Sequence, residues 1–77
     1  MMNRTLPWES WDYWVESLEQ EYENHWPQCA YRYNINRISA GYRHGLIDMW
    51  EVKRLLEVNS SILRSKGIEP WEVLRNE

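Results

Sequence analysis

Two stripes of side chains run together along residues 6–25, and this segment constrains the fold more than any other. Large apolar residues recur at the three- and four-residue steps that place side chains on one face of an α-helix: Trp8, Trp11, Trp14, Val15, Leu18 and Tyr22. Carboxylates recur at the same steps, displaced by one position: Glu9, Asp12, Glu16, Glu19 and Glu23. The pattern predicts an amphipathic helix whose apolar face borders an acidic ridge, the name used below for these carboxylates.

Proline and polar residues mark the ends of this predicted helix. Thr5 can cap its first turn, and Pro7 suits a position where a missing backbone N–H leaves no hydrogen bond unmade. Pro27 stops it, because the residue before a proline is disfavoured in the helical conformation. We therefore expect the helix to begin near Leu6 and to end at about His25.

Residues 28–44 carry two competing periodicities. Tyr31, Tyr33 and Ile35 alternate with polar residues, which is the period of a half-buried strand over residues 30–36. Over a longer span the apolar spacing is helical, and it joins Tyr31, Ile35, Ile38 and Tyr42. An isolated strand would have no partner in this chain, so we predict a helix over residues 28–44 and keep the strand as the alternative. A weaker second apolar face predicts that this helix is central and packed from both sides: Cys29, Tyr33 and Ala40.

The third predicted helix, residues 48–66, has clear end signals. Asp48 and Glu51 have the spacing of a capping box, and Gly67 can adopt the left-handed conformation that ends a helix, as Gly45 can at the end of the second predicted helix. The core stripe of this helix consists of Met49, Val52, Leu55, Leu56, Ile62 and Leu63. Asn59 interrupts the stripe, and we interpret it as a buried amide that sets helix register, the alternative being a contact to a partner.

The end of the chain predicts a short fourth helical turn. Pro70 opens it, and residues 70–75 should place Trp71 and Leu74 against the bundle. A chain of 77 residues has room for one domain, and its six Trp and five Tyr supply the large side chains that a small core needs. We therefore predict an all-α fold for residues 1–77, a small three-helix bundle with a short C-terminal fourth helical turn.

Charge is unevenly distributed, although the net charge is only −3. Residues 1–28 sum to −5, residues 29–54 to +3 and residues 55–77 to −1. The acidic ridge can therefore pair with Arg32, Arg37 and Arg43 of the second helix, or it can stay free for a basic partner. Carboxylates along one helix edge could also imitate a row of nucleic-acid phosphates, or form an ordinary solvated face.

Trp50 is the second candidate for a binding residue. In helical projection it points away from the core stripe and lies among charged and polar residues, with Arg54 one turn further on. Trp, Tyr and Arg dominate the residues that contribute most to protein interfaces. Trp50 and Arg54 therefore join the acidic ridge as predicted partner-binding residues, the alternative being that Trp71 or Ile68 folds back and covers Trp50.

The sequence supports no metal, cofactor or catalytic site. His25 and Cys29 have ligand spacing, but Pro27 breaks the turn between them, and His44 alone does not complete a zinc site. No acid, base and nucleophile can be combined with an oxyanion-hole signature, so we expect no enzyme, no cofactor and no small-molecule substrate.

Nucleic acid and membrane are disfavoured as direct partners. Arginines and tyrosines interleave over residues 31–44, but three arginines spread around one helix are too few for a phosphate-binding patch. Acids flank the Trp-rich first helix, and anionic lipids would repel them. One cysteine, with no signal peptide or membrane-spanning run, leads us to expect a cytoplasmic protein.

The segment from Gly45 to Ile68 bears a faint resemblance to the helical ends of small phage accessory and tail-assembly proteins. The likeness concerns capping and apolar spacing only, and no functional residue is carried over from it. We expect a non-enzymatic protein-interaction protein, of the phage or mobile-element accessory type, that inhibits or adapts a host complex. It could also act as a homodimer. The alternatives are a self-associating assembly protein and a nucleic-acid-binding or nucleic-acid-mimicking module.

Overall fold

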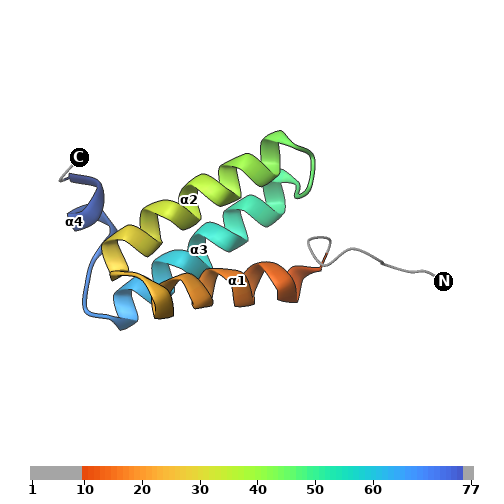
Figure 1. Ribbon diagram of the computed structural model, residues 1–77. Coiled ribbons are helices and arrows are strands. Elements are labelled where there is room, and N and C mark those ends of the chain that lie inside the picture. Colours follow the sequence, from red (N-terminus) through yellow and green to blue (C-terminus); the bar gives the residue numbers. More distant parts are fainter. Residues whose placement is uncertain (1–9, 76–77) are drawn as a thin grey trace.

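The computed structural model describes residues 10–75, and these form four helices with no strand among them. They are α1 (Trp11–Asn24), α2 (Pro27–Arg43), α3 (Met49–Ser65) and the short α4 (Pro70–Arg75). The predicted all-α fold, with three long helices packed together and a short fourth, is confirmed (Figure 1). Residues 30–36 lie inside α2, so the strand alternative is wrong.

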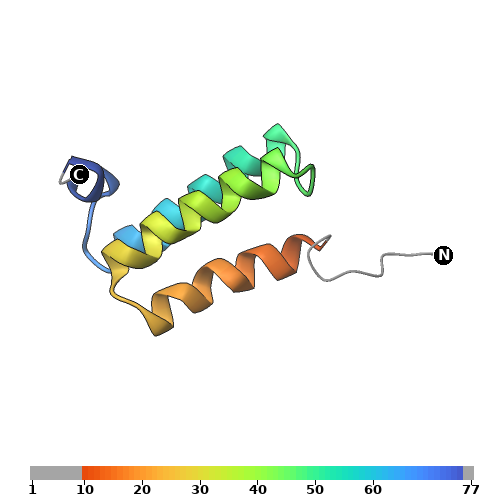
Figure 2. The same cartoon turned by 45° about the horizontal axis from the view of Figure 1, so that its top comes forward.

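The three long helices alternate in direction. α1 and α3 run the same way, and α2 runs antiparallel to both, as Figures 1 and 2 show. All three pack on one another, while α4 lies at the end of the bundle where α2 begins. The first turn of α3, which contains Trp50, is at the opposite end.

α1 is shorter than the predicted helix over residues 6–25. Ser10 has extended backbone angles, with φ −96° and ψ 135°, so the helix begins at Trp11. His25 is extended as well, because the chain must leave the helix before Pro27 opens α2. The predicted roles of Thr5, Pro7, Trp8 and Glu9 lie outside the described residues.

The end signals of α3 are confirmed. The Asp48 carboxylate accepts a hydrogen bond from the Glu51 N–H at 2.8 Å, and the Asp48 N–H donates to the Glu51 carboxylate at 2.9 Å. Gly45 and Gly67 have positive φ, 75° and 84°, as the predicted left-handed positions require.

The core consists of two apolar clusters along the bundle. The first joins all three long helices and the loop before α3: Trp14, Leu18, Ile38, Ile47 and Leu55. The second brings in α4: Tyr22, Ala30, Tyr31, Leu63 and Val73. Of the predicted apolar stripes, three residues instead have large exposed surfaces: Trp11, Tyr42 and Met49. Each lies in the first or last turn of its helix.

A polar layer lies between the helices and consists of Tyr22, Asn34 and Asn59, all buried. The Tyr22 hydroxyl donates to Asn59 Oδ1 at 2.8 Å, and Asn34 Nδ2 donates to the same oxygen at 3.0 Å. Asn34 Nδ2 also donates to the Leu18 carbonyl at 3.1 Å, and Asn59 Nδ2 donates to the Tyr31 carbonyl at 3.2 Å. These bonds connect all three long helices, so the interpretation of Asn59 as a buried register-setting amide is supported.

α2 packs on both α1 and α3, but α1 and α3 also pack on each other, so α2 is not a central helix, and its predicted second apolar face is wrong. Cys29 and Tyr33 are exposed. α2 faces α1 instead through small or polar residues, among them Gly41, whose absent side chain makes room for the Trp14 indole. A Cβ atom on Gly41 would lie 2.7 Å from Trp14 Cη2.

The predicted contacts of α4 are also wrong. Val73 is the buried residue, whereas Trp71 is 55% exposed and Leu74 is 48% exposed. A helix of six residues offers the bundle only one face, and Val73 occupies it beside Leu63. The Arg32 guanidinium holds this turn in place by donating to the Val73 carbonyl at 3.1 Å. Trp71 instead stacks under the guanidinium of Arg75, 5.1 Å from the ring centroid.

Candidate functional site

A groove runs between α1 and α3, and it is the candidate site. Its hollow has a volume of about 350 Å³ and is lined by Trp11, Arg54, Glu57, Val58 and Ser61. Val58, which lines the hollow, is half-buried and packs on the first core cluster, as does Val15 of α1. The groove therefore has an apolar floor and a polar edge on α3.

Trp50 is not among the residues that line this hollow, but it lies on α3 close to one of them. It is 68% exposed and lies one helical turn before Arg54, on the same face of α3. Ile68 packs on the second core cluster at the other end of α3, and Trp71 belongs to α4 at that same end. The alternative in which either residue covers Trp50 is wrong.

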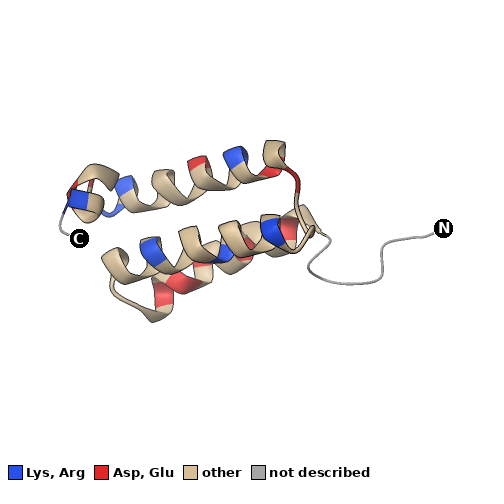
Figure 3. Ribbon diagram, turned by 90° about the horizontal axis from the view of Figure 1, so that it is seen from above, with Lys and Arg blue, Asp and Glu red and all other residues tan. Residues whose placement is uncertain are grey.

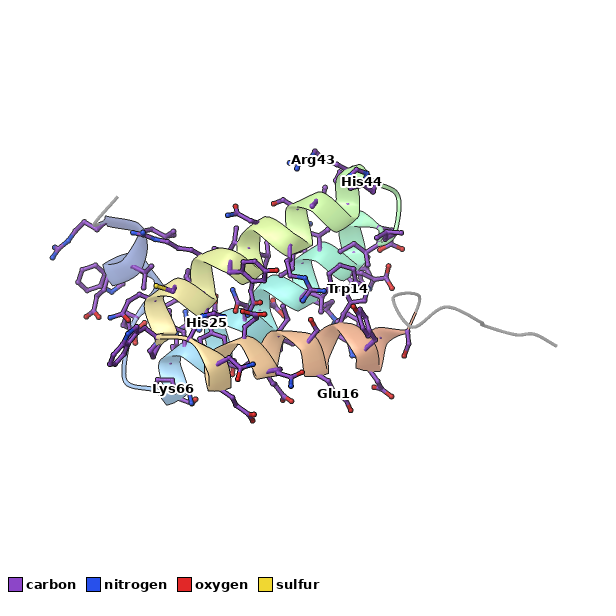
Figure 4. The ribbon with its side chains drawn as sticks, viewed as in Figure 1. Trp14, Glu16, His25, Arg43, His44 and Lys66 are labelled. Atoms are coloured by element: carbon purple, nitrogen blue, oxygen red, sulfur yellow. The ribbon has the colours of Figure 1, made fainter. Side chains whose placement is uncertain are left out.

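The acidic ridge lies along α1, and Trp11 is the α1 residue that lines the hollow. The described members of the ridge, Asp12, Glu16, Glu19 and Glu23, are all exposed. In helical projection they follow Trp11 and Val15, on the opposite side of α1 from Ser17, which receives a hydrogen bond from Arg37 of α2. Figure 4 shows Glu16 pointing away from α2, whereas Trp14 points toward it.

None of these ridge carboxylates forms an ion pair with any residue between 10 and 75. The pairing that the sequence allowed with α2 does not occur, because two of the three arginines make other contacts. Arg37 lies 5.2 Å from the Trp14 ring centroid and also contacts Ser17, while Arg32 binds the Val73 carbonyl. Arg43 is exposed at the far end of α2 (Figure 4).

Charge is separated between α1 and α2. Over its described length α1 carries five acids and no base, and α2 carries three arginines and no acid (Figure 3). The ridge therefore has no cation close to it on its own helix, and its carboxylates add to a negative field along this side of the bundle.

The fold brings together residues that the sequence analysis considered separately. Trp11 of α1 and Arg54 of α3 line one hollow, so the acidic ridge and the pair Trp50–Arg54 lie on the two helices that form it. Trp11 is the missed member, since the helical pattern assigned it to the core, yet it is 39% exposed. The signal that would have identified it is Ser10 as the N-cap, which puts Trp11 at the first position of α1 and not inside a helix that begins near Leu6.

Other surface hollows offer less chemistry. Glu21, His25, Cys29 and Tyr33 line one of about 320 Å³ at the turn between α1 and α2, where His25 Nε2 lies 3.4 Å from a Glu21 carboxylate oxygen. Across residues 10–75, no three His, Cys, Asp or Glu side chains are grouped so as to hold a metal ion. No helix in that range is both long and apolar enough to span a bilayer.

One tyrosine has a perturbed acidity. Burial raises the pKa of the Tyr22 hydroxyl well above its ordinary value, and the neighbouring Tyr31 raises it further. The hydroxyl therefore stays protonated and remains a hydrogen-bond donor to Asn59 at neutral pH. The perturbation belongs to the core and not to the groove.

Comparisons with protein-family models, curated proteins and solved structures found no match to this chain. The resemblance of Gly45–Ile68 to phage accessory proteins therefore stays a prediction.

Proposed function

We propose that this protein is a non-enzymatic protein-binding protein, an inhibitor or adaptor of a protein complex, and that it binds through the α1–α3 groove. The observation that carries the proposal is a hollow lined by Trp11 and Arg54, with the exposed Trp50 one turn before Arg54 and a row of unpaired carboxylates along α1. Trp and Arg are the residue types whose burial contributes most to protein–protein affinity.

The exposed indoles support this proposal energetically. A side chain of this size removes roughly 150–250 Å² from water when it is buried, at about 25 cal/mol per Å². Trp50 keeps most of that surface in solvent. Capping by Asp48 and Glu51 holds the first turn of α3 in place, so the indole is presented on a fixed backbone.

Self-association is the second candidate, since an exposed Trp50 would also suit a homodimer. The charges favour a different partner. Two acidic ridges brought together would repel each other. Arg32 and Arg37, which could receive the ridge of a second copy, already make contacts within their own chain.

The proposal is tested by capture of a partner from lysate of the cells that encode the chain. The wild-type protein is compared with Trp50→Ala and with the matched control Trp26→Ala. Trp26 is 79% exposed at the α1–α2 turn, so the control removes an equally large indole outside the groove. We expect Trp50→Ala to lose at least about tenfold in affinity, as hot-spot residues do, and Trp26→Ala to bind normally.

Two results would contradict the proposal. If folded Trp50→Ala captures the partner as well as the wild-type protein does, the groove is not the binding surface. A concentration-dependent dimer in sedimentation, lost in Trp50→Ala, would support the self-association alternative instead.

A further inference from the structure

We propose that the occupant of the α1–α3 groove is a basic amphipathic helix of the partner. This inference rests on the proposed function and adds the chemistry of the ligand. It follows from the direction of the helices, the apolar floor and the charge of the α1 edge.

The shape of the groove fits a helix. α1 and α3 run parallel, and helices of a bundle pack with their axes nearly aligned, so a further helix in this groove would complete a four-helix arrangement. Val15 and Val58 supply apolar surface on its floor. A ligand helix would contact them with apolar residues at i, i+3, i+4 and i+7.

The length of the site follows from the ridge. From Asp12 to Glu23 the helix rises roughly 16 Å, at about 1.5 Å per residue. A ligand helix of about three turns therefore covers the whole ridge. Trp11 and Trp50 lie at the end of the groove where α1 and α3 begin, and they would hold a large apolar residue near one end of the ligand.

The charge of the ligand follows from the α1 edge. None of the ridge carboxylates forms an ion pair with a cation among residues 10–75. Along the helix, each carboxylate lies about one turn from the next. Lysines or arginines on the flank of the ligand helix that faces α1 would meet them. The α3 edge offers both signs, Arg54 and Glu57, and so imposes less preference.

A second copy of this chain does not provide such a helix. α1 is acidic, and α3 carries both signs. α2 is basic, but Arg37 is stacked on Trp14 and Arg32 is bonded to Val73. The chemistry therefore points to a helix of a different protein.

The test uses the full chain and a synthetic probe. The probe is a peptide of about 18 residues with leucines at helical spacing and lysines elsewhere. Two controls accompany it, a scrambled peptide of the same composition and a peptide with glutamate in place of lysine. Binding is followed by amide NMR shifts and by affinity at low and at high salt.

A pair of protein variants isolates the ridge. Glu16→Gln with Glu19→Gln removes two ridge charges. Gln28→Lys with Ser39→Lys changes the net charge by the same amount at exposed positions on α2. We expect the probe to shift the amides of Val15, Val58 and Ser61, and to bind the ridge variant about tenfold more weakly than wild type. The α2 variant should bind within about twofold of wild type.

Three results would overturn the inference: no binding of the probe, equal binding of the scrambled or acidic peptide, or amide shifts confined to α2. If the probe fails while capture of the native partner still depends on Trp50, the proposed function stands and the partner is not a basic helix. If capture is also independent of Trp50, both proposals fail.

Discussion

Removing the Tyr22 hydroxyl by Tyr22→Phe tests the polar layer of the core. The hydroxyl is buried and donates to Asn59 Oδ1 at 2.8 Å, with the Asn59 carbonyl at 3.1 Å. After the change, Asn59 Oδ1 still accepts from Asn34 Nδ2 at 3.0 Å, so the substitution itself leaves no further buried acceptor unpaired beyond Asn34 Oδ1. The expected loss of unfolding free energy is therefore that of one buried hydrogen bond, about 1–1.5 kcal/mol.

Asn59→Ala should lose more stability than Tyr22→Phe. It removes both bonds that Oδ1 accepts and the bond that Nδ2 donates to the Tyr31 carbonyl, and it leaves a cavity at a fully buried position. We expect a loss of about 3 kcal/mol. In a chain of this size, each kcal/mol lowers Tm by roughly 4–8 °C.

Tyr31→Phe is the matched control. Its hydroxyl lies 3.5 Å from Ser60 Oγ, a long contact in a partly buried place, so removing it should change stability by less than about 0.5 kcal/mol. Urea unfolding followed by circular dichroism measures all three variants. Equal losses for Tyr22→Phe and Tyr31→Phe, or a loss below about 1 kcal/mol for Asn59→Ala, would refute the assignment of the layer as a stabilising network.

Three further changes test local features of the fold. Gly41→Ala should lose about 1–3 kcal/mol, because its Cβ would lie 2.7 Å from Trp14 Cη2; wild-type stability in urea unfolding would contradict that contact. Asp48→Ala removes the capping box with Glu51 and should lose about 1 kcal/mol in thermal unfolding, whereas an unchanged Tm would show that α3 does not depend on this cap. Above about pH 10 the unfolded chain releases the Tyr22 proton while the folded chain, with its raised pKa, keeps it, so stability should fall by about 1.4 kcal/mol per pH unit. Tyr22→Phe should lack this contribution to the fall of unfolding free energy with pH. If the free energy of unfolding falls equally steeply in both proteins, the pKa of Tyr22 is not raised.

Features that depend on neighbours in sequence were predicted well. The capping box at Asp48 and the left-handed glycines Gly45 and Gly67 need only a few consecutive residues. The helical character of α2 also followed from its spacing, once a lone strand had been judged to lack a partner.

Features that depend on the direction of packing were predicted less well. The apolar pattern of α2 predicted that Cys29 and Tyr33 would pack on a second helix. α1 instead packs on α2 at Gly41, which has no side chain, and Tyr33 is exposed. Asn34 was not singled out, since an isolated asparagine gives no sign that another buried amide lies 25 positions along the chain. A helix of six residues is too short for its sequence to show which face is buried. The prediction buried Trp71 and Leu74, whereas Val73 is the buried residue of α4.

The candidate site was predicted in parts but not as a whole. The acidic ridge, Trp50 and Arg54 were each recognised from helical projection and residue type. Their place on the two helices that form one hollow followed only from the parallel course of α1 and α3. Such an arrangement depends on how α2 connects these helices, and the spacing within one helix contains no information about it.

The polar layer has a consequence for the kinetics of binding. Asn59 is bonded to α1 through Tyr22 and to α2 through Asn34 and the Tyr31 carbonyl, so α3 cannot slide along α1 without breaking buried hydrogen bonds. The backbones of both helices are therefore in position before any ligand arrives, so the conformational entropy cost of ordering a backbone falls on the ligand. Encounter would be accelerated by the carboxylates of α1 and slowed by salt. The lifetime of the complex would instead depend on how completely the exposed indoles are buried.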